Sequence, residues 1–441
     1  MEFQKFTYHT LDDVRRTARR LSVSLPLSES MDALRQPLSA GPLQLANRIA
    51  LQPMEGCDGT PDGRPGELTL RRYQRFARGG AGLIWYEATA VAQEGRANPR
   101  QLFLNEQTLD SFRAQVEQIK AEGMRQNGFA PAVICQLTHS GRYAKPEGVP
   151  APLIAYNNPI FEKERPIDQS RILSDDSLKQ LEEAFGNAAR LAQRAGFDGA
   201  DLKCCHRYLL SETLSAFTRK GAYGGSFENR TRLLRNAVAA AQSAVDGSFL
   251  ITSRMNLYDG FPYPFGFGVS PDGGLAPDLA EPEALVKILH QDLRLPLLNF
   301  SIGNPYVNPH VNRPYDGGPY VPDEHPLEGV ARMMRCIGQV KKAVPSLCVA
   351  GSGFSYLRQF SPQLAAGAVE QGVCDLAGFG RMAFAYPEFP RDLLSGGGFD
   401  ARKSCIACGK CSALMRAGTV AGCVVRDGET YLPFYQAHCH A

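Results

Sequence analysis

Three proton-carrying side chains, Lys203, His206 and Tyr208, stand close together in the middle of the chain. They directly follow a short apolar run, Phe197 to Leu202, which predicts a buried strand beginning after Gly196. In barrels and open α/β sheets, catalytic side chains lie at the carboxyl ends of strands. The spacing therefore predicts a site that handles protons. An ordinary polar surface turn is the alternative interpretation.

Four cysteines near the C-terminus form a second candidate site. Cys405, Cys408, Cys411 and Cys423 have the spacing C-x2-C-x2-C-x11-C. Three thiolates on one tight loop, with a fourth returning from nearby, are typical of a cubane iron–sulfur cluster. A four-cysteine structural zinc site is the alternative, although zinc sites more often pair two C-x2-C knuckles at a longer separation. The spacing favours a [4Fe-4S] cluster.

Two glycine-rich turns indicate a site for a phosphate group. The sequences VAGSG (349–353) and AGFGR (377–381) end two apolar runs late in the chain. Barrels commonly bind phosphate at their last two strands through glycine backbone N–H groups. Arg381 would add a positive charge and a fork of donors.

The elements that must position these residues follow a regular alternation. Apolar runs alternate with amphipathic stretches such as 177–194, 228–245, 281–293 and 327–344. Eight such runs are strand candidates: 48–54, 80–89, 131–139, 197–203, 248–256, 296–302, 347–353 and 374–381. This pattern predicts an α/β fold, a closed (β/α)8 TIM barrel, with a doubly wound open sheet as the alternative. Polar residues at several strand ends predict one mouth that binds a large polar ligand, under a long loop over 141–172.

We expect three segments in the chain. Residues 1–42 form an N-terminal extension with a basic amphipathic helix over 11–21, residues 43–395 form the barrel, and residues 396–441 form the cysteine-rich segment and tail. The 441 residues are 44% hydrophobic and 21% charged, as in ordinary globular proteins.

The net charge and the hydropathy of the chain limit which binding partners and which cellular compartment we expect. The net charge of +3 gives no argument for nucleic acid or a membrane surface. We find neither an apolar run of about 18 residues nor a signal peptide, so we expect a cytoplasmic protein. In a reducing compartment the twelve cysteines indicate metal or redox sites together with core packing.

These motifs together resemble the old yellow enzyme family, and most closely its iron–sulfur branch, which includes 2,4-dienoyl-CoA reductase and bacterial enoate reductases. The resemblance runs in order from residue 46 to 425. Its segments are NRIALQPM, GGAGLIWYEATAVAQEGR, QLTHSGR, GFDGADLKCCHRYLL, YGGSFENRTR, VAGSGF, AGFGR and the four-cysteine run. The resemblance implies a TIM barrel with FMN at its mouth, and a flavoprotein oxidoreductase of the NADH:flavin type.

The resemblance also implies roles for individual residues in holding FMN. Pro53, Met54 and Ala88 would contact the flavin ring, and Gln136 its pyrimidine edge. Arg254 would lie at the N1–O2 end of the ring. The phosphate would be held by Gly353, Gly380 and Arg381.

At the substrate, the resemblance implies an ene-reductase. Lys203 and His206 match the two donors that hold a carbonyl oxygen, and Tyr208 matches the acid that protonates the α carbon. Reduced FMN would give hydride to the β carbon of an α,β-unsaturated carbonyl or carboxyl compound. Donors aimed at the oxygen stabilise the negative charge that develops there.

Three positions depart from the family pattern. Lys203 stands where histidine is usual, which leaves the substrate class open and allows a Schiff-base lyase as an alternative. Arg207 replaces a usual glycine, and we expect it to point to solvent rather than bind an acidic substrate. Glu55 stands where threonine or cysteine is usual, and we expect it to pair with a nearby cation.

A fourth departure concerns electron supply. Longer members carry an FAD- and NAD(P)H-binding region with a G-x-G-x-x-G turn, and no such motif follows Cys423. We therefore expect a separate flavoprotein or ferredoxin to feed the cluster, with direct NAD(P)H reduction of FMN and a structural cluster as the alternative. Amine oxidation of the trimethylamine dehydrogenase type and a non-catalytic electron-transfer subunit are alternative functions. The sequence leaves a homo-oligomer open.

Overall fold

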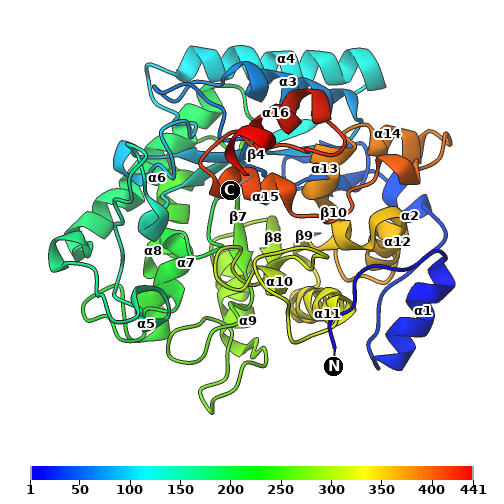
Figure 1. Cartoon of the computed structure of the whole chain (residues 1–441). Coiled ribbons are helices and arrows are strands. Elements are labelled where there is room, and N and C mark those ends of the chain that lie inside the picture. The colour runs from blue at the N-terminus through cyan, green and yellow to red at the C-terminus, as the bar shows by residue number, and fades with distance from the viewer. Residues whose placement is uncertain (1, 440–441) are drawn as a thin grey trace.

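Eight parallel strands close into a barrel at the centre of the protein. The computed structural model describes residues 2–439 (Figure 1). The strands pair in the closed order β10-β3-β4-β5-β6-β7-β8-β9. Their bounds are β3 (Ile49–Leu51), β4 (Leu83–Ala90), β5 (Ala132–Thr138), β6 (Gly199–Leu202), β7 (Leu250–Asn256), β8 (Leu297–Ser301), β9 (Cys348–Gly351) and β10 (Leu376–Phe379). Seven lie within one predicted run each and β4 extends one residue beyond its run, so the (β/α)8 prediction is confirmed. The open-sheet alternative is wrong, because β10 pairs with both β9 and β3.

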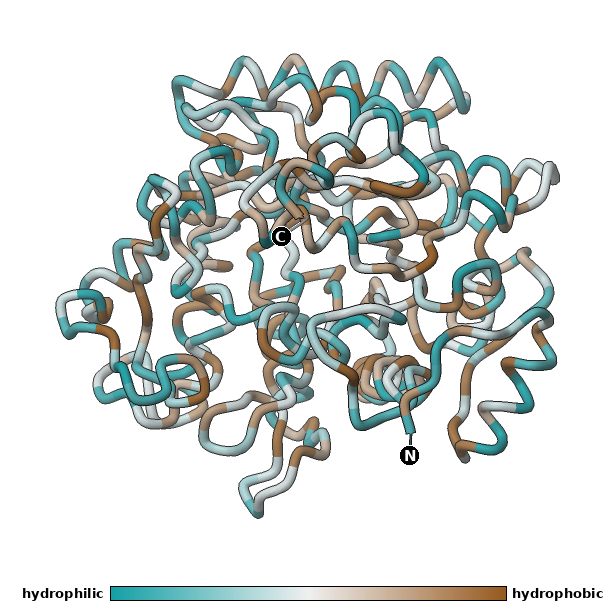
Figure 2. The backbone as a smooth tube through the Cα atoms, in the orientation of Figure 1, coloured by the Kyte–Doolittle hydropathy of each residue, from teal (hydrophilic) through white to brown (hydrophobic). Residues whose placement is uncertain are grey.

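The long helices surround the barrel and bury one face each. In Figure 2 hydrophobic and hydrophilic positions alternate along them, as amphipathic helices require. Ser174 caps α6 (Asp175–Arg194) by accepting a hydrogen bond from the backbone N–H of Ser177. The helices are α3 (Glu67–Arg78), α4 (Leu109–Asn127), α6 (Asp175–Arg194), α8 (Phe227–Ser243), α9 (Ala280–Lys287) with the π-turn η4 (Ile288–Asp292), α11 (Pro326–Ala343) and α12 (Ser361–Glu370).

A short hairpin closes the end of the barrel where the strands begin. Strand β1 (Leu38–Ala40) pairs antiparallel with β2 (Leu43–Leu45). Side chains of the hairpin pack with Trp85 and other residues from the starts of the barrel strands. The turn holds Gly41 at φ +59°, and a Cβ there would lie 2.5 Å from Pro296 Cγ. The hairpin therefore leaves only the opposite end of the barrel open to ligands.

The N-terminal segment packs beside the barrel. Helix α1 (Leu11–Arg20) confirms the predicted amphipathic helix, and Thr10 caps it in a capping box with Asp13. Helix α2 (Asp32–Arg35) follows and packs against α12. In Figure 1 this segment lies beside α11 and α12.

The C-terminal segment returns across the open end of the barrel (Figure 1). After α13 (Arg381–Ala385), α14 (Phe389–Leu394) and η6 (Ala401–Lys403) it forms α15 (Lys410–Arg416) and α16 (Gly428–His438). The Ala421 N–H donates to the Gly56 carbonyl at 2.7 Å, and the Asp427 carboxylate pairs with Arg71 and Arg75 of α3. Residues 440 and 441 of the predicted tail lie outside the described part of the chain.

The remaining short elements lie in the loops at the open end. The long loop over 141–172 is fixed by Glu212, whose carboxylate accepts from Arg142 Nε and from the Ala155 N–H, both at 2.6 Å. Across residues 2–439 we find no helix long and apolar enough for a membrane span. The loop elements are η1 (Gln93–Gly95), η2 (Gly141–Tyr143), α5 (Pro159–Glu162), η3 (Gln169–Arg171), α7 (Leu209–Leu214), α10 (Pro309–Asn312) and η5 (Phe354–Phe360).

Candidate active site

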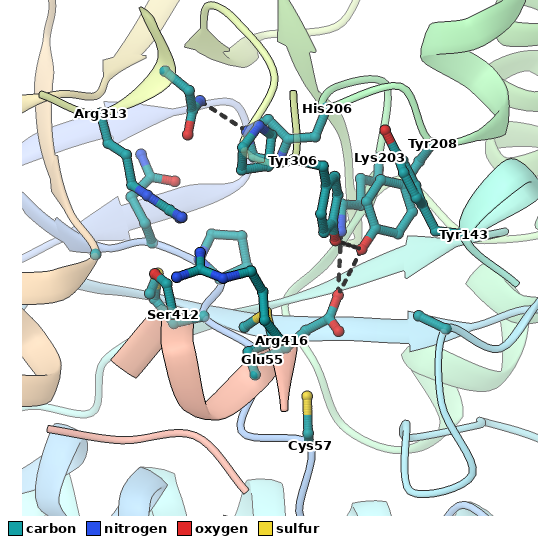
Figure 3. A pocket seen from close by; sticks show the side chains of 18 of the residues that line it. Glu55, Cys57, Tyr143, Lys203, His206, Tyr208, Tyr306, Arg313, Ser412 and Arg416 are labelled. Carbon is teal, nitrogen blue, oxygen red and sulfur yellow. Dashed lines mark hydrogen bonds and ion pairs between the residues drawn. The ribbon is translucent and has the colours of Figure 1, made fainter. Parts of the chain in front are cut away.

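A cavity of about 780 Å³ opens at the carboxyl ends of the strands. Cofactor and small-molecule sites span roughly 300–1,000 Å³, so this cavity has room for a nucleotide-sized ligand. The ends of several strands and their loops line it, and α15 supplies part of the wall (Figure 3).

Most of the predicted site residues meet in this cavity. Nine of them line it: Pro53, Met54, Lys203, His206, Tyr208, Arg254, Gly353, Gly380 and Arg381. Ala88 and Gln136 do not line it. Both are buried in the barrel, where Gln136 Nε2 donates to Asp201 Oδ2 at 2.7 Å and the Ala88 carbonyl accepts from Gln101.

Lys203, Tyr208 and Glu55 form one contact group (Figure 3). Lys203 Nζ donates to Glu55 Oε1 at 3.3 Å and lies 3.4 Å from the centre of the Tyr208 ring. Tyr208 Oη lies 3.5 Å from the same Glu55 oxygen. The expected pairing of Glu55 with a cation is confirmed. Burial, and then the Glu55 charge, raise the pKa of Tyr208 well above its ordinary value, so this phenol keeps its proton at neutral pH.

His206 stands on a turn with unusual backbone geometry. His206 and Arg207 both have φ of +62°, a region that side-chain-bearing residues rarely occupy and that is found at functional sites. Burial lowers the pKa of His206 well below its ordinary value, and the charges of Arg254 and Lys203 lower it further. The imidazole is therefore neutral, and its Nε2 lies 3.2 Å from Asn312 Nδ2.

Arg207 does not point to solvent, so that expectation is wrong. Its side chain is fully buried, with Nη1 3.2 Å from Asp259 Oδ2 and Nη2 3.1 Å from Tyr156 Oη. The left-handed turn directs the side chain behind the cavity, where Ser215 also contacts it. Arg207 therefore anchors the turn that presents His206, and it does not line the cavity.

The glycines and arginines of the cavity fit the demands of a phosphate-bearing flavin. Gly353 has φ +97°, and a Cβ at Gly380 would lie 2.9 Å from Met54 Sδ, so side chains at these positions would fill the cradle. Arg254 lies 8% exposed, and its Nε has no partner among the described residues. Such a buried, unpaired cation is suited to an anionic ligand atom. FMN therefore fits the residues present.

Sequence reasoning missed three further arginines that line the cavity, which are Arg100, Arg313 and Arg416. Arg313 comes from the loop after β8 and Arg416 from α15 (Figure 3). Burial, and then the neighbouring charge of Arg381, lower the pKa of Arg313 to about 10. The loop over 304–328 carries no motif, so no local signal could have found Arg313.

The four cysteines of the C-terminal segment surround a second, small cavity. Cys405, Cys408, Cys411 and Cys423 all line it, together with Arg381 of the main cavity. Among residues 2–439, no three or more His, Cys, Asp or Glu side chains are grouped to hold one metal ion.

Fold and site together define a flavin-binding oxidoreductase barrel. The sequence profile of the NADH:flavin oxidoreductase / NADH oxidase family matches residues 33–263, and the chain belongs to this family. The "NADPH dehydrogenase" of Halalkalibacterium halodurans is 36% identical over 213 residues, which cover 47% of this chain and 59% of that protein. A "Metal reductase" of Desulforamulus reducens is 31% identical over 237 residues, covering 53% of this chain and 34% of that one.

Solved structures share the fold. A 2-naphthoyl-CoA reductase complex aligns with a TM-score of 0.72 and 21% identity, over 90% of this chain and 57% of that one. Histamine dehydrogenase from Rhizobium sp. 4-9 aligns with a TM-score of 0.69 and 23% identity, over 89% of this chain and 52% of that one. An old yellow enzyme homologue from Zymomonas mobilis aligns with a TM-score of 0.63 and 22% identity, over 83% of this chain and 94% of that one. These structures confirm the predicted barrel, and the family profile confirms a flavin oxidoreductase of the old yellow enzyme type.

Proposed function

We propose that this protein is an FMN-dependent ene-reductase acting on an α,β-unsaturated carbonyl or carboxyl compound. FMN, when bound, supplies hydride chemistry at the mouth of the barrel. The observation that carries the proposal is the meeting of Lys203, His206 and Tyr208 in one cavity with a glycine and arginine cradle that fits FMN.

In this proposal the cradle holds the cofactor. Gly353, Gly380 and Arg381 hold the phosphate, and Pro53 and Met54 lie along the flavin ring. Arg254 places its unpaired charge at the N1–O2 end. Ala88 and Gln136 support the ring from the barrel wall, because neither lines the open cavity.

The substrate is held and protonated by three side chains. Lys203 and neutral His206 donate hydrogen bonds to the substrate carbonyl oxygen, where negative charge develops. Tyr208 then gives its proton to the α carbon as a general acid. Its raised pKa ensures that the proton is present when substrate binds.

Tyr208→Phe tests this function directly. General acid catalysis contributes about 10²–10⁴-fold, so alkene reduction should fall by that factor. Reduction of bound FMN by NAD(P)H or dithionite should stay intact. An electron-transfer subunit would pass electrons to an acceptor at the same rate in both proteins, and equal rates of alkene reduction would exclude our proposal.

The same cavity gives amine oxidation some support as a second candidate. The Tyr143 and Tyr306 rings contact each other in a tilted arrangement with centroids 4.2 Å apart, and the Tyr208 ring centroid lies 5.6 Å from that of Tyr143. Such aromatic groups bind cationic ligands. However, Lys203 already covers the Tyr208 ring and pairs with Glu55, which disfavours a cationic amine there. Anaerobic flavin reduction by amines, with no alkene reduction, would favour this alternative.

We also propose that the C-terminal segment, residues 396–441, carries a [4Fe-4S] cluster that relays electrons to the barrel of residues 43–395, with 1–42 as an extension. Cys405, Cys408, Cys411 and Cys423 would bind it, and a flavoprotein or ferredoxin, or NAD(P)H acting on FMN, would supply electrons. Protein purified without oxygen should contain about four irons and four sulfides per chain, and Cys408→Ser should lose them. Stoichiometric zinc would contradict the cluster.

A further inference from the structure

Tyr208 is a buried acid that must regain its proton after each turnover. The residue is 2% exposed, so bulk water does not reach it directly. Its hydroxyl contacts the Glu55 carboxylate and the hydroxyl of Tyr306. The structure must therefore provide a route from solvent to Tyr208.

Tyr306 connects Tyr208 with the solvent. Its Oη lies 2.8 Å from Tyr208 Oη, at a normal hydrogen-bond distance. The residue itself is 42% exposed. Tyr306 thus contacts the acid (Figure 3) and is itself exposed to solvent.

The loop after β8 holds Tyr306 in place. Asn304 Oδ1 accepts the Tyr306 backbone N–H at 2.7 Å, and Asn304 Nδ2 donates to Tyr143 Oη at 3.0 Å. The Tyr143 ring in turn packs against the Tyr306 ring in a tilted contact. One asparagine therefore orients both rings, so the short contact with Tyr208 is built into the loop.

We propose that Tyr306 is a second proton-transfer residue, which returns a proton from solvent to Tyr208 after each alkene reduction. This inference rests on the proposed ene-reductase function. As the α C–H bond forms, the Tyr208 O–H bond breaks. The Tyr208 oxygen then takes the proton of Tyr306 Oη, and a solvent or buffer acid reprotonates Tyr306. No electrons move in these steps.

Glu55 keeps both tyrosines of the relay protonated at rest. Burial, and then the Glu55 charge, raise the pKa of both Tyr208 and Tyr306, so neither phenolate persists at neutral pH and the proton deficit passes on to solvent. The Lys203 ammonium over the Tyr208 ring limits the cost of the transient charge. Glu55 acts through these neighbours and is a positioning residue.

The kinetic test compares first and later turnovers in Tyr306→Phe, which keeps the ring and removes the hydroxyl. Prereduced enzyme should complete a first turnover at about the wild-type rate, because Tyr208 already carries its proton. Steady-state turnover, measured with re-reduction fast enough not to limit the wild type, should fall about 10²-fold. Small acidic buffers should restore it. Tyr320→Phe, a half-exposed tyrosine outside this cavity, is the matched control.

The outcomes separate the two proposals. If wild-type enzyme reduces no alkene in a first turnover, the ene-reductase function fails. If the wild type reduces the alkene in a first turnover, and Tyr306→Phe sustains wild-type turnover without any buffer effect, the relay is wrong.

A second readout does not depend on activity. A fluorinated tyrosine at position 208 reports its hydrogen bond through the fluorine NMR shift. Tyr306→Phe should move that resonance, whereas Tyr320→Phe should leave it in place. An unmoved resonance in Tyr306→Phe would show that the two hydroxyls do not interact, and it would overturn the relay.

Discussion

Replacing Arg207 with methionine should destabilise the protein strongly, because it leaves a buried charge without its partner. Arg207 and Asp259 are both fully buried and lie 3.2 Å apart. Removing one partner of a buried pair costs about 3–5 kcal/mol. Asp259 keeps two neutral donors, Asn256 Nδ2 at 3.0 Å and the Phe267 N–H at 3.2 Å. We therefore expect Arg207→Met to lower the free energy of unfolding by about 3 kcal/mol, the lower end of that range.

Urea unfolding of the FMN-loaded protein measures this loss through the midpoint and slope. Arg402→Met is the matched control, because that side chain is 90% exposed and should cost less than about 0.5 kcal/mol. Asp259→Asn should also destabilise, and the double variant should lose less than the two single losses added together. Unfolding of Arg207→Met at the control's midpoint would refute the buried-pair reasoning, as would simple additivity in the double variant.

One further prediction concerns His139, which is buried directly after β5, and two concern the site. Burial lowers the pKa of His139 to about 4, so between that pH and about 6.5 the unfolded chain binds one proton more. The stability of the wild type relative to His139→Asn should therefore fall by about 1.4 kcal/mol per unit as pH drops through this window, and parallel pH profiles would contradict it. Glu55→Gln removes a charge that raises the pKa of Tyr208, so the alkaline limb of alkene reduction should move to lower pH; an unmoved limb would show that Glu55 does not act on this acid. Gly353→Ala places a Cβ at φ +97° and 3.0 Å from Met333 Cγ, which should cost about 1–2 kcal/mol and lower the FMN content; full flavin occupancy would argue against the phosphate cradle.

The barrel was predictable because its information is local. Each of the eight strands lies within one apolar run of the sequence, apart from the last residue of β4, and the amphipathic stretches between them form helices. Strands buried on both faces read as continuous apolar runs, and the helices that cover them carry one apolar stripe. The β1–β2 hairpin went unpredicted, because three-residue strands are too short to show a period.

The candidate site was partly predictable for the same reason. Lys203, His206 and Tyr208 follow one strand, and parallel strands in a barrel bring their carboxyl ends to one mouth. The residue types and positions along the chain were enough to expect them at that mouth. They could not show which way each side chain points.

The sequence alone thus determined the barrel, the position of the catalytic turn and the cysteine spacing, since each depends on residues near one another in the chain. Only the tertiary structure decided the contacts between distant segments. It turned Arg207 inward through backbone at φ +62°, brought Tyr306 to Tyr208 across 98 positions, and placed Arg416 of α15 in the cavity wall. Such contacts depend on how loops from different strand ends converge, and no local period or motif records that convergence.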